Sequence, residues 1–317
     1  MKKHLCILTV LILLTLLCSC KKDTQVTKQG FNFDTVINIT VDKKHLPQAE
    51  EAFSLCSEME DTFSRTKEGS ELYNINQNKF SELSDNMYKV IDFSLSVSEN
   101  SDGAFDITVA PLCDLWNIKE RTVPPYDGEI ADALENVGYK NITLSPFSTG
   151  NSQIDLGAVA KGYAADCIRD LFVKNGINKA IIDLGGNVAL IGEYTVGIRN
   201  PFDPDSLYAR ITLKDKSAVT SGAYQRYFEH NGTRYHHIID PRTGKCANSG
   251  LASVTVISSS SMQADALSTA IYVLGEKGLS LCNKYPDTDA LLITENGDVI
   301  TTKGFEEKYS LEILNKQ

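Results

Sequence analysis

The stretch DLGAVAKGYAAD, residues 155–166, lies near the middle of the 317-residue chain and predicts a strand-to-helix junction at the centre of the fold. One acid, Asp155, precedes a run of small residues, and a helical pattern starts near Ala158. Small side chains have two explanations here. They leave room for a bulky, charged ligand against the backbone, or they let a strand and a helix pack closely.

A helix start at this junction favours an anionic ligand, although the spacing from Gly157 to Lys161 is not the GxxxxGK[ST] of a P-loop. Free amides and the positive end of the helix dipole attract phosphate. Lys161 adds a compact positive charge, and Asp155 could bind a polar edge of the ligand. The alternative is structural: Asp155 caps the helix and Lys161 is solvated.

The hydrophobic pattern on both sides of the junction predicts an α+β fold rather than a doubly wound sheet. Strands and helices alternate without a regular βαβ rhythm, and residues 290–294 and 298–302 flank a turn as a hairpin. Alternating or apolar runs predict strands over residues 35–41, 180–183, 194–198, 209–213, 234–239 and 251–257. Helical patterns cover residues 47–65, 86–99, 129–136, 158–174 and 261–283.

The N-terminal residues predict export and lipidation. Residues 1–19 have a basic start and an apolar core too short to span a membrane comfortably, as in a signal peptide. The sequence Leu-Cys-Ser-Cys before Lys21 resembles a bacterial lipoprotein cleavage box, which predicts a lipid on Cys20; an ordinary signal peptide is the alternative. We then expect a polar tether over residues 20–30, a folded domain over residues 31–317, and anchoring to a bacterial membrane outside the cytoplasm, on the periplasmic side of a diderm cell.

Charge and cysteine usage exclude other classes. Removing residues 1–19 takes away two of the 31 basic residues and none of the 41 acidic ones, so the formal charge moves from −10 to −12. Without a basic stripe, no nucleic-acid partner is predicted. Five scattered cysteines would remain beyond Cys20, without a CxxC pair, which argues against a disulfide framework and a zinc site.

Two further glycine-containing stretches could contribute to a site. In SDGAFDITVAPL, residues 101–112, Phe105 could stack on an aromatic ligand while Asp106 accepts hydrogen bonds from it. The alternative makes Phe105 a core residue and Asp106 a cap. In IIDLGGNVAL, residues 181–190, the paired glycines could form a binding wall or merely bend a strand.

Histidines gather in SGAYQRYFEHNGTRYHHIIDPRTGK, residues 221–245. Only one of the adjacent pair His236 and His237 can face a given site if the segment is a strand. A neutral imidazole near pH 7 is a plausible general base, whereas an isolated histidine is more often structural.

The last stretch, ISSSSMQADALSTAIYVLG, residues 257–275, predicts a serine-capped helix. Asp265 and Thr269 are four residues apart, so they lie on one face of that helix near its positive end. A carboxylate and a hydroxyl are suitable ligands for Mg²⁺, which takes few protein ligands and completes its shell with water and phosphate oxygens. Alternatively, Asp265 only complements the helix dipole and Thr269 bonds back to the helix.

Taken together, SDGAFDITVAPL, DLGAVAKGYAAD, DLGGN, HHIIDPRTG and ADALSTAIYVLG, in this order behind a lipoprotein signal, closely resemble the ApbE family of flavin transferases. The resemblance runs from about Phe31 to the last helix and strands. It implies the ApbE-like α+β fold, related to the T-fold, with mixed, mainly antiparallel sheets flanked by helices. It also implies Mg²⁺-dependent transfer of FMN from FAD to a Ser or Thr hydroxyl of an acceptor protein, such as a subunit of a membrane redox complex, with release of AMP.

The resemblance also assigns the flavin-binding residues. Ala104, Phe105 and Asp106 match the flavin-contacting Ala-Phe-Asp of the family, and Asp155 and Lys161 match its FAD-binding acid and lysine.

Metal and catalytic residues follow from the same resemblance. Ala158 matches a residue whose backbone carbonyl binds the metal, and Asp265 and Thr269 match the side-chain ligands. His237 matches the histidine that is expected to accept the proton of the acceptor hydroxyl. Two rival functions use the same residues: an FAD pyrophosphatase that admits water, and a lipoprotein that binds FAD without chemistry.

Two departures from the family concern the FAD site. Where many members have Met-Gly-Thr at the first strand, this chain has Phe33, Asp34 and Thr35, so only Thr35 is kept as a cofactor-binding residue. Thr66 stands where many members have a tyrosine over the adenine. Both changes concern affinity for the adenine side of FAD and the balance between transfer and hydrolysis.

Overall fold

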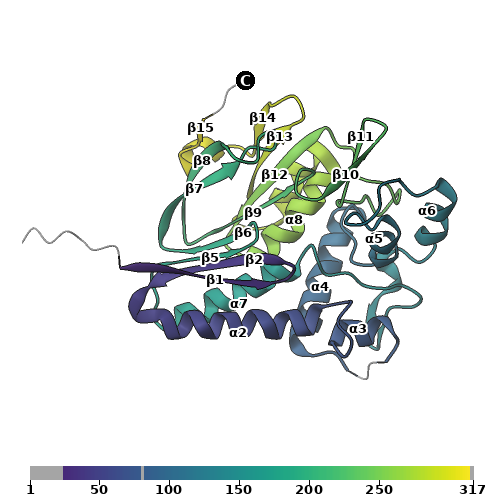
Figure 1. Cartoon of the computed structure of the whole chain (residues 1–317), viewed down its shortest axis with the longest axis horizontal. Coiled ribbons are helices and arrows are strands. Elements are labelled where there is room, and N and C mark those ends of the chain that lie inside the picture. The colour runs from purple at the N-terminus through teal and green to yellow at the C-terminus, as the bar shows by residue number, and fades with distance from the viewer. Residues whose placement is uncertain (1–23, 80–81, 315–317) are drawn as a thin grey trace, which may run out of the picture.

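A computed structural model describes residues 24–79 and 82–314, and its centre is one eight-stranded sheet (Figure 1). All neighbouring strands of this sheet run antiparallel. In spatial order the strands are β1 (Gln25–Asn32), β2 (Thr35–Asp42), β5 (Ala180–Leu184), β6 (Asn187–Ile191), β9 (Ser217–Gly222), β12 (Leu251–Ser258), β13 (Asp289–Thr294) and β14 (Val299–Thr301).

The two faces of this sheet are buried against different layers, because side chains alternate along each strand. In β13, Ala290 and Leu292 belong to the core shared with helices, whereas Leu291 and Ile293 belong to the core on the opposite face. The helical layer contains α2 (Leu46–Phe63), α4 (Asp85–Asn100), α7 (Ala160–Lys174) and α8 (Ser261–Leu274). The opposite layer contains β7 (Glu193–Arg199), β8 (Leu207–Lys214), α9 (Phe305–Tyr309) and β15 (Glu312–Ile313).

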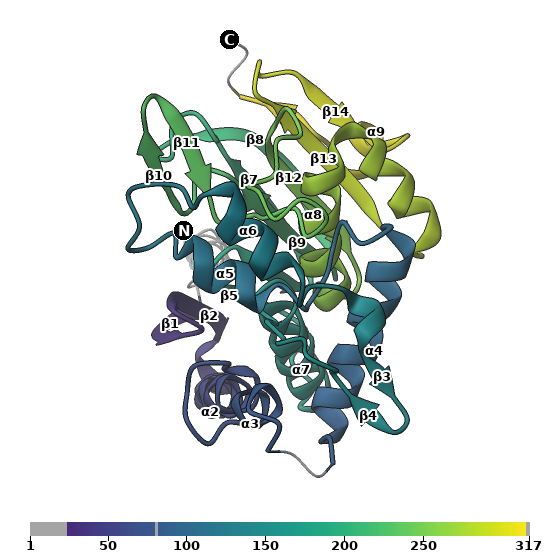
Figure 2. The ribbon, with the colours of Figure 1, turned by 90° about the vertical axis from the view of Figure 1, so that its right-hand side faces the viewer.

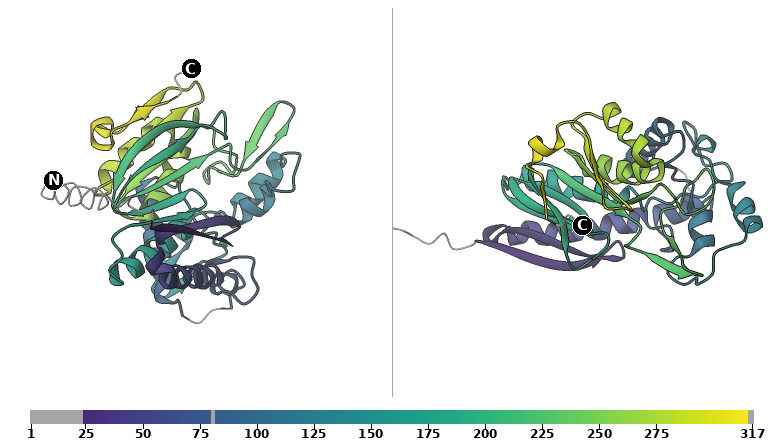
Figure 3. Two further views of the ribbon diagram at one scale, coloured as in Figure 1. Left: turned by 60° about the vertical axis from the view of Figure 1, so that its left-hand side comes forward. Right: turned by 90° about the horizontal axis from the view of Figure 1, so that it is seen from above.

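Several of the smaller elements gather at one end of the sheet, the end that faces the viewer in Figure 2. The hairpin of β10 (Tyr227–His230) and β11 (Thr233–His236) projects from the body of the molecule there (Figure 3). The other small elements are the 3-10 turns η1 (Lys43–His45), η2 (Tyr139–Asn141) and η3 (Gly275–Lys284), the helices α3 (Glu71–Asn76), α5 (Ala110–Trp116) and α6 (Asp127–Leu134), and the strands β3 (Thr143–Leu144) and β4 (Phe147–Ser148).

Helices α7 and α8 cap each other. The carboxylate of Asp166 in α7 accepts hydrogen bonds from the amides of Ser261 (2.7 Å) and Met262 (3.0 Å) at the start of α8. The carboxylate of Asp265 in α8 accepts one from the amide of Gly162 at the start of α7 (3.0 Å). Amides at helix starts have no partner within their own helix, so each acid satisfies groups that would otherwise be unpaired.

Gly162 permits this close approach of the two helices. A Cβ atom at this position would lie 2.4 Å from the carbonyl oxygen of Ser261 and 2.7 Å from Cα of Met262. The small residues of the junction therefore serve tight packing on the α8 side, while Gly157, Ala158 and Ala160 line cavities. Close packing therefore explains Gly162, and room for a ligand explains the small residues that line the cavities.

The predicted α+β class, with mainly antiparallel sheets flanked by helices, is confirmed, and so is the hairpin formed by β13 and β14. The predicted tether is wrong in its extent, because β1 occupies residues 25–32 and pairs with β2 along its whole length. Its polar residues are compatible with a strand at the edge of the sheet, where one side meets solvent. The predicted signal peptide and Cys20 lie outside the described residues. No described helix has the length and apolarity to cross a bilayer.

Three predicted boundaries also change. The strand expected over residues 234–239 ends at His236, and two residues further on the amide of Ile238 bonds to Nδ1 of His236 (3.3 Å) instead of a neighbouring strand. Helix α7 starts at Ala160, two residues later than expected. The helix expected to reach residue 283 changes to a 3-10 turn at Gly275, whose φ of 71° cannot continue an α-helix.

We predict that Gly162→Ala lowers the free energy of unfolding by about 1–3 kcal/mol, because the new methyl group meets backbone atoms that can move only with α8. Urea unfolding measures the change. Gly128→Ala is the matched control, since its methyl group meets nothing within 4 Å and lies in helix α6. Equal stability changes in the two variants would contradict the packing role of Gly162.

Candidate active site

Two adjoining cavities form one cleft at the start of α7. Cavity A has a volume of about 450 Å³ and cavity B about 320 Å³. They share lining residues, among them Gly157, Lys161, Gly185, Arg226 and His237. A continuous cleft with two compartments suits an elongated ligand better than a compact one.

Within the described residues, the structure brings together every predicted site residue in this cleft. Cavity A is lined by Ala104, Phe105, Asp106, Asp155, Ala158, Lys161, His237, Asp265 and Thr269. Cavity B adds Thr35. These residues come from five separate sequence stretches, so their convergence supports a common site.

Oxygen ligands converge where α7 and α8 begin. One carboxylate oxygen of Asp265 accepts the Gly162 amide, and Lys161 Nζ lies 4.0 Å from that same oxygen. The Gly162 amide would otherwise close a helical turn onto the carbonyl of Ala158. In the described part of the chain that carbonyl therefore has no backbone donor, and Ala158 lines cavity A.

Thr269 completes this set of oxygen atoms. It is half-buried, lines cavity A, and its hydroxyl lies 3.4 Å from the hydroxyl of Ser221. One carboxylate, one hydroxyl and one carbonyl are hard oxygen donors that fit Mg²⁺. Among the described residues no group of three or more His, Cys, Asp or Glu side chains could hold a metal ion. A metal here would therefore keep several positions open for water or phosphate.

Asp155 is held by an arginine that the sequence did not single out. Arg65 Nε donates to one oxygen of Asp155 (2.6 Å), while the Gly157 amide donates to the other (2.7 Å). Arg65 also donates to Asp114 (2.7 Å) and lines cavity A. Asp155 thus fixes the turn before α7, and Arg65 brings a further cation to the cleft. Arg65 is the last residue of the range predicted as a helix and belongs to no motif, so only the tertiary structure identifies it.

Phe105 and Asp106 are both buried beside cavity A. The carboxylate of Asp106 accepts bonds from the amide (2.7 Å) and hydroxyl (2.6 Å) of Thr108 and from the amide of Tyr139 (2.7 Å). Burial raises the pKa of Asp106, and these bonds counteract that rise. The carboxylate is used within the protein, which favours the structural alternative; its contact with a flavin stays a prediction.

The adjacent histidines have different environments. Both ring nitrogens of His236 are used, since Nε2 donates to the carbonyl of Ala247 (3.0 Å) and Nδ1 accepts from the amide of Ile238 (3.3 Å). His237 lines both cavities of the cleft, and its Nδ1 lies 3.3 Å from the carbonyl oxygen of Arg226. A carbonyl only accepts, so Nδ1 carries the proton and Nε2 is left as the basic nitrogen. The expectation that only one of the pair faces the site is confirmed.

Burial lowers the pKa of His237 to about 4, and the nearby charges of Arg226 and Lys161 act in the same direction. The imidazole is therefore neutral at pH 7. A neutral imidazole with a free Nε2 can accept a proton from a hydroxyl in the cleft.

Gly185 and Thr35 are in close contact in the wall of cavity B. Gly185 has a φ of 68°, and a Cβ atom there would lie 2.3 Å from Oγ1 of Thr35. The first glycine of the pair is therefore required for this wall, which supports the binding-wall explanation of the DLGGN stretch. The second, Gly186, accommodates a turn in which its amide donates to Asp183 (3.2 Å).

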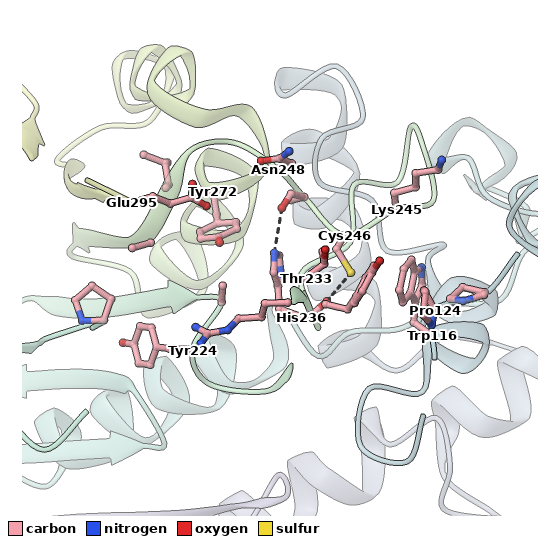
Figure 4. Close-up of a pocket in the computed structure, with 18 of the residues that line it drawn as sticks. Trp116, Pro124, Tyr224, Thr233, His236, Lys245, Cys246, Asn248, Tyr272 and Glu295 are labelled. Carbon is pink, nitrogen blue, oxygen red and sulfur yellow. Dashed lines mark hydrogen bonds between the residues drawn. The ribbon is translucent and has the colours of Figure 1, made fainter. Parts of the chain in front are cut away.

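A third cavity, cavity C, is larger, about 620 Å³, and is lined by the residues of β11 (Figure 4). Figure 4 shows His236 in its wall between Tyr272 and Trp116. Trp116 stacks on Tyr235 with ring centroids 5.7 Å apart and also lines cavity A, so this stack separates the two spaces. Because both nitrogens of His236 are used, cavity C lacks the free base that cavity A has.

The fold and the cleft define a class: an α+β protein whose paired helix starts collect cations and hard oxygen ligands around a dinucleotide-sized space. Comparison with known proteins identifies the family within this class. The ApbE family model matches residues 33–292, and the chain belongs to the ApbE family.

Relatives and solved structures agree with this placement. An FAD:protein FMN transferase of Klebsiella pneumoniae (strain 342) is 36% identical over 83% of this chain and 87% of its own. One from Treponema pallidum (strain Nichols) is 33% identical over 82% and 80%. The crystal structure of the ApbE protein from Thermotoga maritima has a TM-score of 0.81 at 31% identity, covering 89% of this chain and 98% of its own. Flavin transferase ApbE from Vibrio cholerae has a TM-score of 0.77 at 28% identity, covering 89% and 98%.

The low pKa of His237 predicts a pH dependence of folding. Between its ordinary pKa of 6.5 and about 4, the unfolded chain binds a proton that the folded chain does not, so stability falls as pH decreases through this window. We expect the free energy of unfolding to fall less between pH 6.5 and pH 4.5 in His237→Gln than in the parent protein, as measured by urea unfolding. Above pH 7 the free energy of unfolding should change with pH equally in both proteins, which serves as the internal control. An equally steep loss of stability in the variant would contradict the low pKa of His237.

Proposed function

We infer that this chain is an FAD:protein FMN transferase, which moves FMN from FAD to a Ser or Thr hydroxyl of an acceptor protein and releases AMP. Family membership and the names of the relatives support this activity. The observation that carries it in the structure is the placement of His237, Lys161 and Asp265 in one cleft. This combination offers a base, a phosphate-binding cation and a metal ligand within one site.

The proposed reaction breaks the phosphoanhydride bond of FAD and forms a phosphate ester bond to the acceptor. The acceptor oxygen attacks the phosphorus of the FMN half, and the bond from that phosphorus to the bridging oxygen of the diphosphate breaks. AMP leaves with the electron pair of that bond. The hydroxyl proton goes to Nε2 of His237, which is neutral and unbonded to a protein donor in the described chain. The products are a protein phosphodiester of FMN and AMP.

We propose that Mg²⁺ binds between Asp265, Thr269 and the carbonyl of Ala158, where the donor set fits it. When bound, the ion withdraws charge from the diphosphate. Lys161 stabilises negative charge on the same oxygens, and its own position is fixed by a hydrogen bond to the carbonyl of Gly157 (3.2 Å). Phe105 and Ala104, both buried, exclude water from the side of cavity A that would receive the flavin ring.

The test is incubation with FAD, Mg²⁺ and a purified redox-complex subunit that contains a flavin-accepting Ser or Thr. We expect covalent fluorescent label on the acceptor, no label after chelation of Mg²⁺, and at least about 100-fold slower labelling by His237→Gln, because the proton acceptor is lost. Binding of FAD to the variant is the control. Free FMN without labelled acceptor would indicate a pyrophosphatase, and the absence of any turnover would indicate a flavin-binding protein; either would contradict the proposal.

We also propose that Cys20 is lipidated and holds the enzyme to a bacterial membrane, facing outside the cytoplasm. The sequence pattern before Lys21 supports this placement, and Cys20 itself lies outside the described residues. The folded domain begins at Gln25, so only a few residues separate it from the proposed anchor.

Growth with labelled palmitate tests the anchor. We expect the label in the parent protein and its absence from Cys20→Ala, together with release of that variant from the membrane fraction. A change of a cysteine in the folded domain, Cys282→Ala, controls for other thiols. Persistent labelling of Cys20→Ala would refute the proposed site.

A further inference from the structure

Asp34 joins three segments of the chain at the cleft. Its carboxylate oxygen contacts Nζ of Lys119, which follows α5, and lies 3.5 Å from the guanidinium of Arg226, which lies between β9 and β10. Lys119 lines cavity A, Asp34 lines cavity B and Arg226 lines both. The ion pairs therefore connect the lining of cavity A with the lining of cavity B.

The turn that carries Asp34 is held in place. Phe33 and Asp34 have φ values of 53° and 58° in the two-residue connection between β1 and β2. This left-handed conformation is unfavourable for a bulky residue such as Phe33. Glu60 of α2 compensates, because its carboxylate accepts bonds from the amide of Phe33 (3.0 Å) and the side chain of Asn32 (2.9 Å). Asp34 is thus fixed at the tip of an anchored turn.

Lys119 and Arg226 differ from the other cations of the cleft in their partners. Arg65 binds two acids, and Lys161 lies beside Asp265. Among the described residues, Asp34 is the only acid within ion-pair distance of Lys119 and of Arg226. Two cations thus share one carboxylate, and an excess positive charge remains at this point of the cleft.

The ion pairs of Asp34 are exposed, with 54% of the Asp34, 59% of the Lys119 and 45% of the Arg226 side chains accessible. Exposed pairs of this kind contribute little stability, and salt screens them. A ligand that carries two phosphate charges can therefore replace one carboxylate on both cations. Arg226 can release Asp34 without moving His237, because His237 is held by the backbone carbonyl of Arg226 and not by its guanidinium.

We propose that Asp34 is an ionic clasp across the cleft, which holds Lys119 and Arg226 until the phosphates of the dinucleotide displace it. The clasp rests on the proposed function for the identity of the ligand. It lowers affinity for FAD, because the phosphates compete with a resident carboxylate. It also keeps the two cations positioned at the cleft in the ligand-free protein.

Equilibrium binding of FAD, followed by flavin fluorescence without acceptor, tests the clasp. We expect Asp34→Asn to bind FAD about three- to fivefold more tightly, because asparagine tolerates the left-handed conformation and removes the competing charge. The gain should shrink at 0.5 M salt. Riboflavin, which has no phosphate, should bind Asp34→Asn and the parent protein equally. Asp127→Asn, which removes the acid of an exposed ion pair with Lys245 away from the cleft, should leave the Kd for FAD unchanged.

Combining substitutions tests whether Asp34 acts through Lys119 and Arg226. Lys119→Gln with Arg226→Gln should weaken FAD binding, and adding Asp34→Asn to that background should give no gain. An unchanged or higher Kd for FAD in Asp34→Asn, or an equal gain for riboflavin, would overturn the clasp while leaving the proposed function intact. Absence of FAD binding in the parent protein would overturn both.

Discussion

The structure depends on an exchange of carboxylates between two helices. Asp166 of α7 caps the start of α8, and Asp265 of α8 binds the amide of Gly162 at the start of α7. Neither helix start can shift without leaving backbone amides of the other unpaired, which is costly in a buried setting. The exchange therefore fixes Asp265 and Lys161 beside each other before any ligand enters. Such preorganisation is what stabilisation of phosphate charge requires, since the groups need not rearrange during the reaction.

Elsewhere in the cleft, single residues likewise connect different parts of the site. The backbone carbonyl of Arg226 selects the tautomer of His237, while its side chain reaches Asp34. Asp155 fixes the turn before α7 and holds Arg65 at the cleft. Binding and proton transfer are therefore linked through short backbone segments rather than through one rigid element.

Much of the site could be predicted from the sequence because each contributing stretch is local. The four-residue spacing of Asp265 and Thr269 on a helix, and the alternation that separates His236 from His237, follow from backbone geometry alone. The remaining features of the site and fold depend on contacts between segments that are distant in the sequence. Arg65 reaches the cleft through partners far away in the chain, and no local pattern marks it. Asp34 differs from the family's Met-Gly-Thr, but its ion pairs with Lys119 and Arg226 depend on the tertiary structure. Strand β1 is not evident from the sequence for the same reason, since its polar sequence becomes a strand only by pairing with β2.

We propose that a divalent ion binds between the starts of α7 and α8 and positions the diphosphate. Crystals grown with FAD and Mn²⁺ in place of Mg²⁺ test this site directly through the anomalous signal of the metal. We expect one metal peak within coordination distance of the Asp265 carboxylate, the Thr269 hydroxyl and the Ala158 carbonyl, with phosphate oxygens completing its shell. A diphosphate bound in the cleft with the metal elsewhere, or with Asp265 contacting only Gly162, would contradict it.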